Sequence, residues 1–373
     1  MHLAVALDGA GWHPAAWREP AARPAELFTA RYWLDQVREA QAGRLDFVTI
    51  EDSLGPQSGR SDGPDERTDQ VRGRLDAVLV AARIAPATRG IGLVPTATVT
   101  HTEPFHISKA IATLDYVSGG RAGWQAQVSG QAAEAAHFGR REAPGLEDLF
   151  DEAADHVEVV RRLWDSWEDD AEIRDAATGR FIDRDKLHYV DFEGRWFRVK
   201  GPSITPRPPQ GQPVVAALGH ARIPSRFATR AADVVHVTPS GVEHARELAE
   251  QVPVRHVFGD LVVVLEETEA AARDAKRRLD DLDGAEYTSD ATVFTGTPAG
   301  LAGLLLDWHA AGLTGFRLRP ARIPGDLRAV TRGLAPELRG RGVFRRDYEA
   351  TTLRGLLGLP RPASRYAAGA RSA

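Results

Sequence analysis

The chain of 373 residues contains no cysteine, which excludes disulfide bonds, thiolate nucleophiles and cysteine-ligated metal ions. It also lacks an excess of one charge, because 47 basic residues stand against 52 acidic ones, and no basic face is evident. Nucleic acid is therefore not expected as a partner. No apolar run approaches the roughly 18 residues of a membrane span, and the N-terminus has no charged segment followed by an apolar one. Together these absences predict a soluble, cytoplasmic protein without a membrane partner.

Several catalytic motifs are missing as well. No Gly-x-Gly-x-x-Gly string follows an early strand, so the chain itself is not expected to bind a nicotinamide dinucleotide. There is no His-Glu-x-x-His string and no evenly spaced cluster of His and Asp, and we therefore predict no metal site. Neither a Ser-His-Asp arrangement nor a pair of catalytic carboxylates stands out.

The sequence does contain a regular alternation of short apolar runs and amphipathic stretches. This pattern predicts an α/β fold of parallel strands joined by helical crossovers. Eight apolar runs can be counted, the number of strands in a closed (β/α)8 TIM barrel. An open, doubly wound sheet is the alternative, but it usually carries the glycine-rich turn that is absent here. The predicted strands cover residues 2–7, 46–51, 91–97, 122–128, 214–218, 234–237, 254–266 and 315–318.

The stretch from about residue 131 to 212 breaks this alternation. Its first part predicts an amphipathic helix, because apolar residues recur at helical spacing from Leu149 to Trp167. Its second part is polar and rich in helix breakers, and Phe192, Trp196 and Phe197 indicate a short hairpin. We interpret this stretch as an insertion packed on the barrel. Residues 1–373 would then form a single domain that ends in a C-terminal extension.

The most specific string is LDYVSGGRAGWQAQVS, residues 114–129, where two glycines allow a helix to end and a strand to begin tightly. It resembles LDHLSGGRAGWN of the bacterial-luciferase-like flavin-dependent monooxygenases, in the branch of nitrilotriacetate, EDTA and dibenzothiophene-sulfone monooxygenases. Other segments resemble this family in the same order along the chain. They are GAGWHPAAWREP near the start, LDFVTIEDSL, THTEPFHISKAIATLDYVSGGRAGW, the segment 179–215 and GLAPELRGRGVFRRDYEATTLRGLLGL near the end.

The resemblance implies a luciferase-like barrel in which reduced FMN binds at the C-terminal mouth and reacts with O2 to oxidise a small organic substrate. The cofactor carries the difficult chemistry, while the protein supplies binding, orientation and exclusion of water. A separate flavin reductase would supply the reduced FMN. Relatives of this kind commonly pair through barrel helices, so we expect a homodimer or a larger homo-oligomer. A deazaflavin is the alternative cofactor.

Three polar residues align with flavin contacts of that family. Asp52 follows the second predicted strand, where a carboxylate accepts hydrogen bonds from flavin or ribityl groups. Alternatively, Asp52 is an exposed residue that only caps the loop that follows. Thr98 ends the third strand, where a β-branched residue is also ordinary. Gln125 replaces the family Asn, so it keeps an amide that donates and accepts but reaches one methylene further.

The turn after the fifth predicted strand departs from the family. The family reads Gln-Ala-Gly-Ser-Ser, whereas this chain has Ala217, Leu218, Gly219, His220 and Ala221, without either serine hydroxyl. Backbone N–H groups of this turn, at the start of a helix, can still hold a phosphate. His220 would add charge when it is protonated. We therefore retain Gly219, His220 and Ala221 as cofactor-binding candidates.

Two further departures fall where the family holds the flavin phosphate with a His and a Tyr. Leu146 and Phe150 occupy these positions, and neither side chain can form a hydrogen bond. Each lost charge-assisted hydrogen bond typically costs ~1.5–3 kcal/mol. A second hypothesis follows, in which the chain is a degenerate, non-catalytic homologue or partner subunit with weak or altered cofactor binding.

Three residues are candidates for chemistry or substrate binding. His101, in the loop after the third strand, replaces a family aromatic residue and is a candidate general acid, although a solvated loop His is the commoner case. His13 and Trp17 lie in the loop after the first strand, where family members contact the substrate. The identity of that substrate does not follow from these residues.

Overall fold

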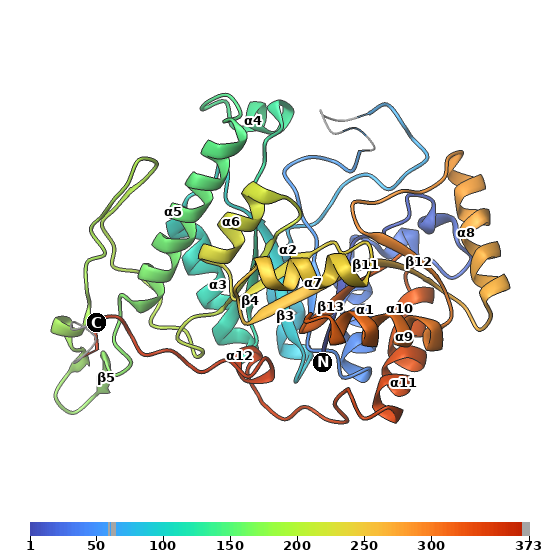
Figure 1. The fold of residues 1–373 in the computed structure, drawn as a ribbon. Coiled ribbons are helices and arrows are strands. Elements are labelled where there is room, and N and C mark those ends of the chain that lie inside the picture. Colours follow the sequence, from blue (N-terminus) through green and yellow to red (C-terminus); the bar gives the residue numbers. More distant parts are fainter. Residues whose placement is uncertain (59, 61–64, 368–373) are drawn as a thin grey trace.

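The computed structural model describes residues 1–58, 60 and 65–367, without the side chains at positions 222 and 223. Eight parallel strands close into a barrel, because β1 pairs with β13 at one junction and β10 with β11 at another (Figure 1). The predicted TIM-barrel class is thereby confirmed. The strands are β1 (His2–Leu7), β2 (Phe47–Ile50), β3 (Gly92–Thr98), β4 (Gly123–Gln127), β9 (Val214–Leu218), β10 (Val234–Val237), β11 (His256–Leu265) and β13 (Gly315–Pro320).

A ninth strand, β12 (Thr292–Gly296), was missed by the sequence analysis. It pairs with the second half of β11, residues 261–265, whereas β10 pairs with the first half, residues 256–259. Four of its five residues are only half-buried, so the strand shows no apolar run. β12 therefore extends the sheet beside the mouth without joining the closed ring.

Local sequence explains where the helices begin and end. Thr29 accepts the backbone N–H of Tyr32 at the start of α1 (Ala30–Ala42), and Asp76 caps α2 (Ala77–Ile84) in the same way. The predicted helix–strand junction is also present, since α3 (Pro104–Ser118) ends at Gly119 with φ of 68°. The outer layer continues with α6 (Arg222–Ala231), α7 (Val242–Gln251), α8 (Glu269–Asp283), α9 (Pro298–Ala310), α10 (Gly325–Ala329) and α11 (Ala335–Gly340).

The stretch between β4 and β9 contains two helices and two short hairpins. The long helix α5 packs against α3 and α6, and the indole of Trp164 is buried there and donates to the Ser108 carbonyl oxygen at 2.9 Å. The hairpin expected near Phe192 is present as β7 (Phe192–Glu193) and β8 (Arg198–Val199). The other elements are α4 (Ala132–Phe138), α5 (Leu146–Asp165), β5 (Glu172–Asp175) and β6 (Arg180–Ile182). That the whole chain is one domain stays a prediction.

The C-terminal segment seals the amino-terminal end of the barrel. Leu353 and Leu357, in and just after α12 (Leu353–Leu356), pack into a buried cluster with Phe47 and Phe258 from the strands. Arg345 adds an ion pair of 2.6 Å to the buried Asp46. Figure 1 shows α12 and the N-terminus together at this end, with α4 at the opposite end. A ligand is thus expected at the carboxyl-terminal mouth of the barrel.

Candidate functional site

A cavity of about 470 Å³ opens at the carboxyl-terminal mouth, and we call it the mouth cavity. Residues from the ends of five barrel strands and from the flanking loops and helices form its surface, as expected for this fold. Its walls combine aromatic and aliphatic side chains with a group of paired charges. The lining residues are Asp8, Trp12, Glu51, Asp52, Ser53, Arg74, Ala126, Gln127, Val128, Phe150, Leu218, His220, Pro224, Phe227, Asp290, Arg317 and Arg319.

Gln125 lies directly beneath this cavity and contacts two of its lining residues. Its amide nitrogen donates to Thr96 Oγ1 at 2.9 Å and to Glu51 Oε2 at 3.2 Å. Its amide oxygen accepts from Arg317 Nη1 at 2.5 Å. The amide is fully buried, and protein partners engage both of its ends. Gln125 therefore positions Glu51 and Arg317, and its predicted contact with a flavin stays a prediction.

Two arginines of β13 and one buried carboxylate form the charged floor of the cavity. Asp260 accepts Arg317 Nε at 2.9 Å and Arg319 Nη2 at 2.6 Å. Burial alone would raise the pKa of Asp260, but the two guanidinium groups hold it well below its usual range. Arg319 also lies 4.6 Å from the centre of the Trp12 ring, a cation–π contact. The floor is thus rigid and ionised.

His220 stands at the edge of this floor. Its Nδ1 lies 2.7 Å from Asp290, and its Nε2 lies 3.7 Å from Asp260. Burial would lower the pKa of His220, but interactions with the two carboxylates outweigh burial and raise it. The two carboxylates thus favour protonation of His220, and they also neutralise the charge that it would add.

Asp52 lines the mouth cavity, yet both of its oxygens already accept backbone hydrogen bonds. Oδ1 accepts Ser53 N at 2.8 Å, and Oδ2 accepts Ala77 N at 2.9 Å, at the start of α2. Burial raises the pKa of Asp52 above its usual value. Each carboxylate oxygen has a second lone pair, so a ligand contact remains compatible with this geometry.

The structure does not bring the other cofactor candidates to the cavity surface. Thr98, Gly219 and Ala221 are not among the lining residues. The backbone N–H of Gly219 donates to the His236 carbonyl oxygen at 2.7 Å, and Ala221 is the N-cap of α6 without a side-chain hydrogen bond. Of the predicted cofactor residues, Asp52 and His220 share the mouth cavity, and Gln125 supports its floor.

An aromatic pair forms the wall between the mouth cavity and the helices α5 and α6. Phe150 of α5 and Phe227 of α6 have ring centroids 5.7 Å apart. Leu146, one turn earlier on α5, is 53% exposed and does not line the cavity. This wall presents carbon atoms where the family resemblance implies phosphate contacts.

A second cavity, of about 520 Å³, adjoins the first, and we call it the outer cavity. The two share Asp8, Trp12 and Arg74 as lining residues. Both predicted substrate residues line it. His13 Nε2 lies 3.1 Å from Asp280, and the Trp17 indole donates to the Asp69 carbonyl oxygen at 2.9 Å. Two joined chambers of this size can hold a cofactor and a substrate side by side.

His101 lies outside the linings of both cavities. Its backbone is in the left-handed region with φ of 66°, and its ring stacks on Phe138 at 5.2 Å. Burial lowers the pKa of His101, and the nearby Arg141 adds to this. Among the described residues its Nε2 has no hydrogen-bond partner. The side chain is buried, so the alternative of a solvated loop His does not hold, and the role of His101 as a general acid stays a prediction.

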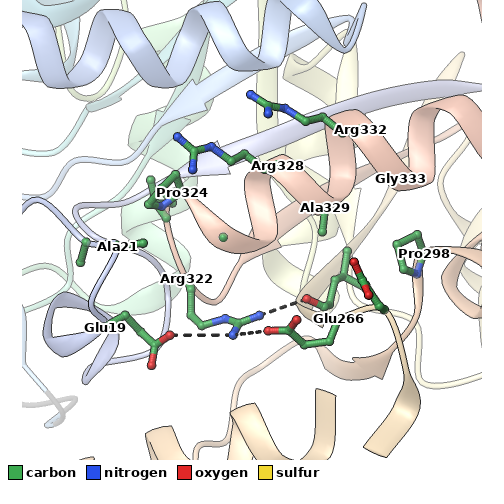
Figure 2. A pocket seen from close by; sticks show the side chains of 15 residues that line it. Glu19, Ala21, Glu266, Pro298, Arg322, Pro324, Arg328, Ala329, Arg332 and Gly333 are labelled. Atoms are coloured by element: carbon green, nitrogen blue, oxygen red, sulfur yellow. Dashed lines mark hydrogen bonds and ion pairs between the residues drawn. The ribbon is translucent and has the colours of Figure 1, made fainter. Parts of the chain in front are cut away.

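A third cavity, of about 470 Å³, lies beside the mouth between the loops after β1, β11 and β13 (Figure 2). Its buried cation is Arg322, which pairs with Glu266 at 2.8 Å and approaches Glu19 at 3.9 Å. Figure 2 shows the side chains of Arg328 and Arg332 extending away from this group. Because the buried charge is already paired, we assign no ligand to this cavity.

Two features are absent from the described ranges, 1–58, 60 and 65–367. No cluster of three or more His, Asp or Glu side chains in them is placed to hold a metal ion. Within the same ranges, no helix is both long and apolar enough to cross a membrane.

Together, the closed barrel, its sealed amino-terminal end and its paired cavities define a (β/α)8 barrel with a candidate ligand site at the carboxyl-terminal mouth. The chain belongs to the luciferase-like monooxygenase family, which matches residues 11–279. The family predicted from the sequence is therefore confirmed.

Individual relatives agree with this assignment over nearly the whole chain. The chain is 30% identical to N-acetyl-S-(2-succino)cysteine monooxygenase of Bacillus subtilis (strain 168), over 98% of each sequence. It is 29% identical to nitrilotriacetate monooxygenase component A of Aminobacter aminovorans, over 97% of each. The structure of EDTA monooxygenase from Chelativorans sp. BNC1 has the same fold, with a TM-score of 0.85 at 24% identity, covering 97% of this chain and 98% of that one.

The charged floor and Glu51, which pairs with Arg317, were not predicted from the sequence. Glu51, Asp260, Arg317 and Arg319 were not singled out, although all four lie in or next to apolar strand segments. A charged residue inside an otherwise apolar strand is the signal that points to them, because a buried charge needs a partner of opposite sign.

Proposed function

We propose that this protein is a flavin-dependent monooxygenase that uses reduced FMN from a separate reductase to oxidise a small organic substrate. One observation carries the proposal beyond family membership: the mouth cavity and the outer cavity adjoin at Trp12 and Arg74. A planar cofactor in the first would face a substrate in the second. The substrates in the names of the two relatives above are small organic molecules.

The chemistry of the mouth cavity suits the ring system of a flavin. Trp12, Leu218 and Phe150 supply apolar walls for a planar heterocycle. On the polar side, Arg74 and Arg319 each have a buried Nε without an acceptor among the described residues. A flavin edge carries several nitrogen and oxygen acceptors, which match guanidinium donors. When bound, the reduced flavin supplies the O2-activating chemistry.

The side chains of the chain have separate tasks in this proposal. Arg319, fixed between Trp12 and Asp260, would donate its Nε–H to an acceptor atom of the ring. The aromatic and aliphatic walls exclude water from the reacting atoms. His13, held by Asp280, and Trp17 orient the substrate in the outer cavity. His101 supports the loop after β3, and we keep it as the candidate acid.

The test compares purified protein with and without a flavin reductase. With NADH alone, the protein should consume no O2 above background. With reductase, NADH, FMN and a library of small thioethers, sulfones and carboxylated amines, it should form an oxygenated product. Product formed from NADH without reductase would contradict the reductase requirement.

A second candidate function is a degenerate partner subunit without catalysis. Phe150 at the cavity wall and His220 between two aspartates favour it, because both remove polar contacts from a bound phosphate. No binding of FMN in either redox state, together with no turnover, would favour this alternative. Turnover with a reduced deazaflavin but not with FMN would instead support the changed cofactor.

A further inference from the structure

The charges of the mouth cavity do not favour a further anion. Its four cationic side chains are paired with carboxylates of the chain, as in the Arg74–Asp8 contact of 3.0 Å and the His220–Asp290 contact of 2.7 Å. Carboxylates also line the cavity in equal number, and Asp260 lies beneath them. A phosphate dianion placed here would meet cations that are already neutralised. Its loss of hydration would then lack compensation.

The side chains of the opposite wall offer no donors to a phosphate either. Phe150, Phe227, Leu218 and Val128 present only carbon atoms from their side chains. Pro224 lies in the first turn of α6 and has no backbone N–H. This proline removes one backbone donor from a helix start of the kind that commonly binds phosphate.

Cations do lie near this wall, but on its far side. A separate cavity of about 440 Å³ is lined by Arg195, Arg226 and Arg230 together with three carboxylates of α5. Phe150 and Phe227 line both this cavity and the mouth cavity, so they stand between the two. The aromatic pair thus separates the mouth cavity from these arginines.

Because the aromatic pair keeps these arginines away from the mouth cavity, we infer that this cavity binds the isoalloxazine and ribityl portion of a flavin without recognising its 5′-phosphate. Riboflavin and FMN then bind with similar affinity, because the phosphate remains hydrated in solvent. This inference rests on the proposed flavin function and specifies the form of the cofactor. It also makes flavin affinity independent of ionic strength, since no charge pair with the ligand is screened.

The direct test is an anaerobic fluorescence titration of the purified protein with riboflavin and FMN, oxidised and reduced. We expect the two Kd values to agree within about threefold, since a single charge-assisted hydrogen bond of ~1.5–3 kcal/mol would separate them by tenfold or more. The Kd values of riboflavin and of FMN should each stay unchanged between low and high salt. FMN binding that is more than tenfold tighter and weakened by salt would overturn the inference and leave the proposed function intact. Absence of binding by either flavin would count against both.

Variants at the wall sharpen the comparison. The double variant Leu146→His, Phe150→Tyr restores polar groups, so it should tighten FMN selectively and leave riboflavin unchanged. Phe150→Leu is the matched control, because it keeps an apolar wall and should change both affinities by the same factor. Phe150→Leu that weakens FMN alone would show that the phosphate contacts this wall and would overturn the inference.

Discussion

Arg317 on β13 donates a hydrogen bond of 2.5 Å to the side-chain oxygen of Gln125 on β4, two strands that are not neighbours in the barrel. The bond crosses the barrel interior, where both side chains are almost fully buried. The same guanidinium pairs with Asp260 and Glu51. Arg317 thereby connects Gln125, which was predicted from the sequence, to Asp260 and Glu51, which were not.

Removing this arginine should strongly destabilise the protein. Arg317→Leu leaves Asp260 and Glu51 with fewer partners in the barrel interior, and breaking a buried pair typically costs about 3–5 kcal/mol. Urea unfolding followed by circular dichroism measures the loss. Arg332→Ala is the matched control, because the Arg332 side chain is 67% exposed in its pair with Glu39, and it should lower the stability far less. Equal losses would contradict the buried network.

Substitutions of Asp52 distinguish its hydrogen bond to the start of α2 from a contact with the flavin. Asp52→Ala removes the acceptor for the backbone N–H of Ala77 and should cost about 1–2 kcal/mol of stability. Asp52→Asn keeps one acceptor oxygen and should cost less. If Asp52 also contacts the flavin, both variants weaken flavin binding in a titration of folded protein. Unchanged affinity in both would leave Asp52 as a cap only.

His220 should make stability depend on pH in a defined direction. Its pKa is raised in the folded state, so the native protein binds this proton more tightly than the unfolded chain. The stabilisation is fully present below the pKa of His220 in the unfolded chain, near 6.5, and it is lost as the pH rises through the higher pKa of the folded state. Thermal unfolding between pH 6 and 9 should show this decline, and His220→Gln should flatten it. The exposed His106→Gln serves as the control and should leave the slope unchanged.

His101 combines a left-handed backbone with a buried ring. His101→Gly relieves the backbone strain but removes the stacking on Phe138, so stability should change by less than about 1 kcal/mol. His101→Asn also tolerates this backbone and lacks the imidazole. If His101 is the acid, both variants should lower the product formed per O2 consumed while Tm stays near that of the parent. Full coupling in both variants would exclude that role.

The expected homo-oligomer can be tested at one exposed apolar residue. Leu79 on α2 is 68% exposed, beside α3, and a subunit contact there would cover it. Light scattering at micromolar concentration should give at least twice the chain mass of 40.5 kDa. Leu79→Arg should shift the mass toward the monomer, whereas the same change at the exposed Phe181 in the β6 hairpin should not. A monomeric parent protein would contradict the expectation.

The sequence alone was sufficient for the barrel and its family. Strands such as β1 and β9 are buried on both faces, so their continuous apolar runs from Leu3 to Leu7 and from Val214 to Leu218 identify them without tertiary information. The two glycines at positions 119 and 120 set the α3–β4 junction, because both adopt positive φ. β12 escaped detection because its half-buried residues lack this pattern.

The candidate site depended on what the closed barrel brings together. Sequence placed Asp52 and Gln125 at strand ends, but only the structure shows that backbone N–H groups and Arg317 already occupy their polar atoms. Which of a residue's lone pairs remain free depends on partners far away in the chain, and no local pattern encodes them. Sequence thus determined the fold class and predicted a site at the carboxyl-terminal mouth. Tertiary packing decided which charges meet at the cavity floor, because strands distant in sequence become neighbours only when the barrel closes.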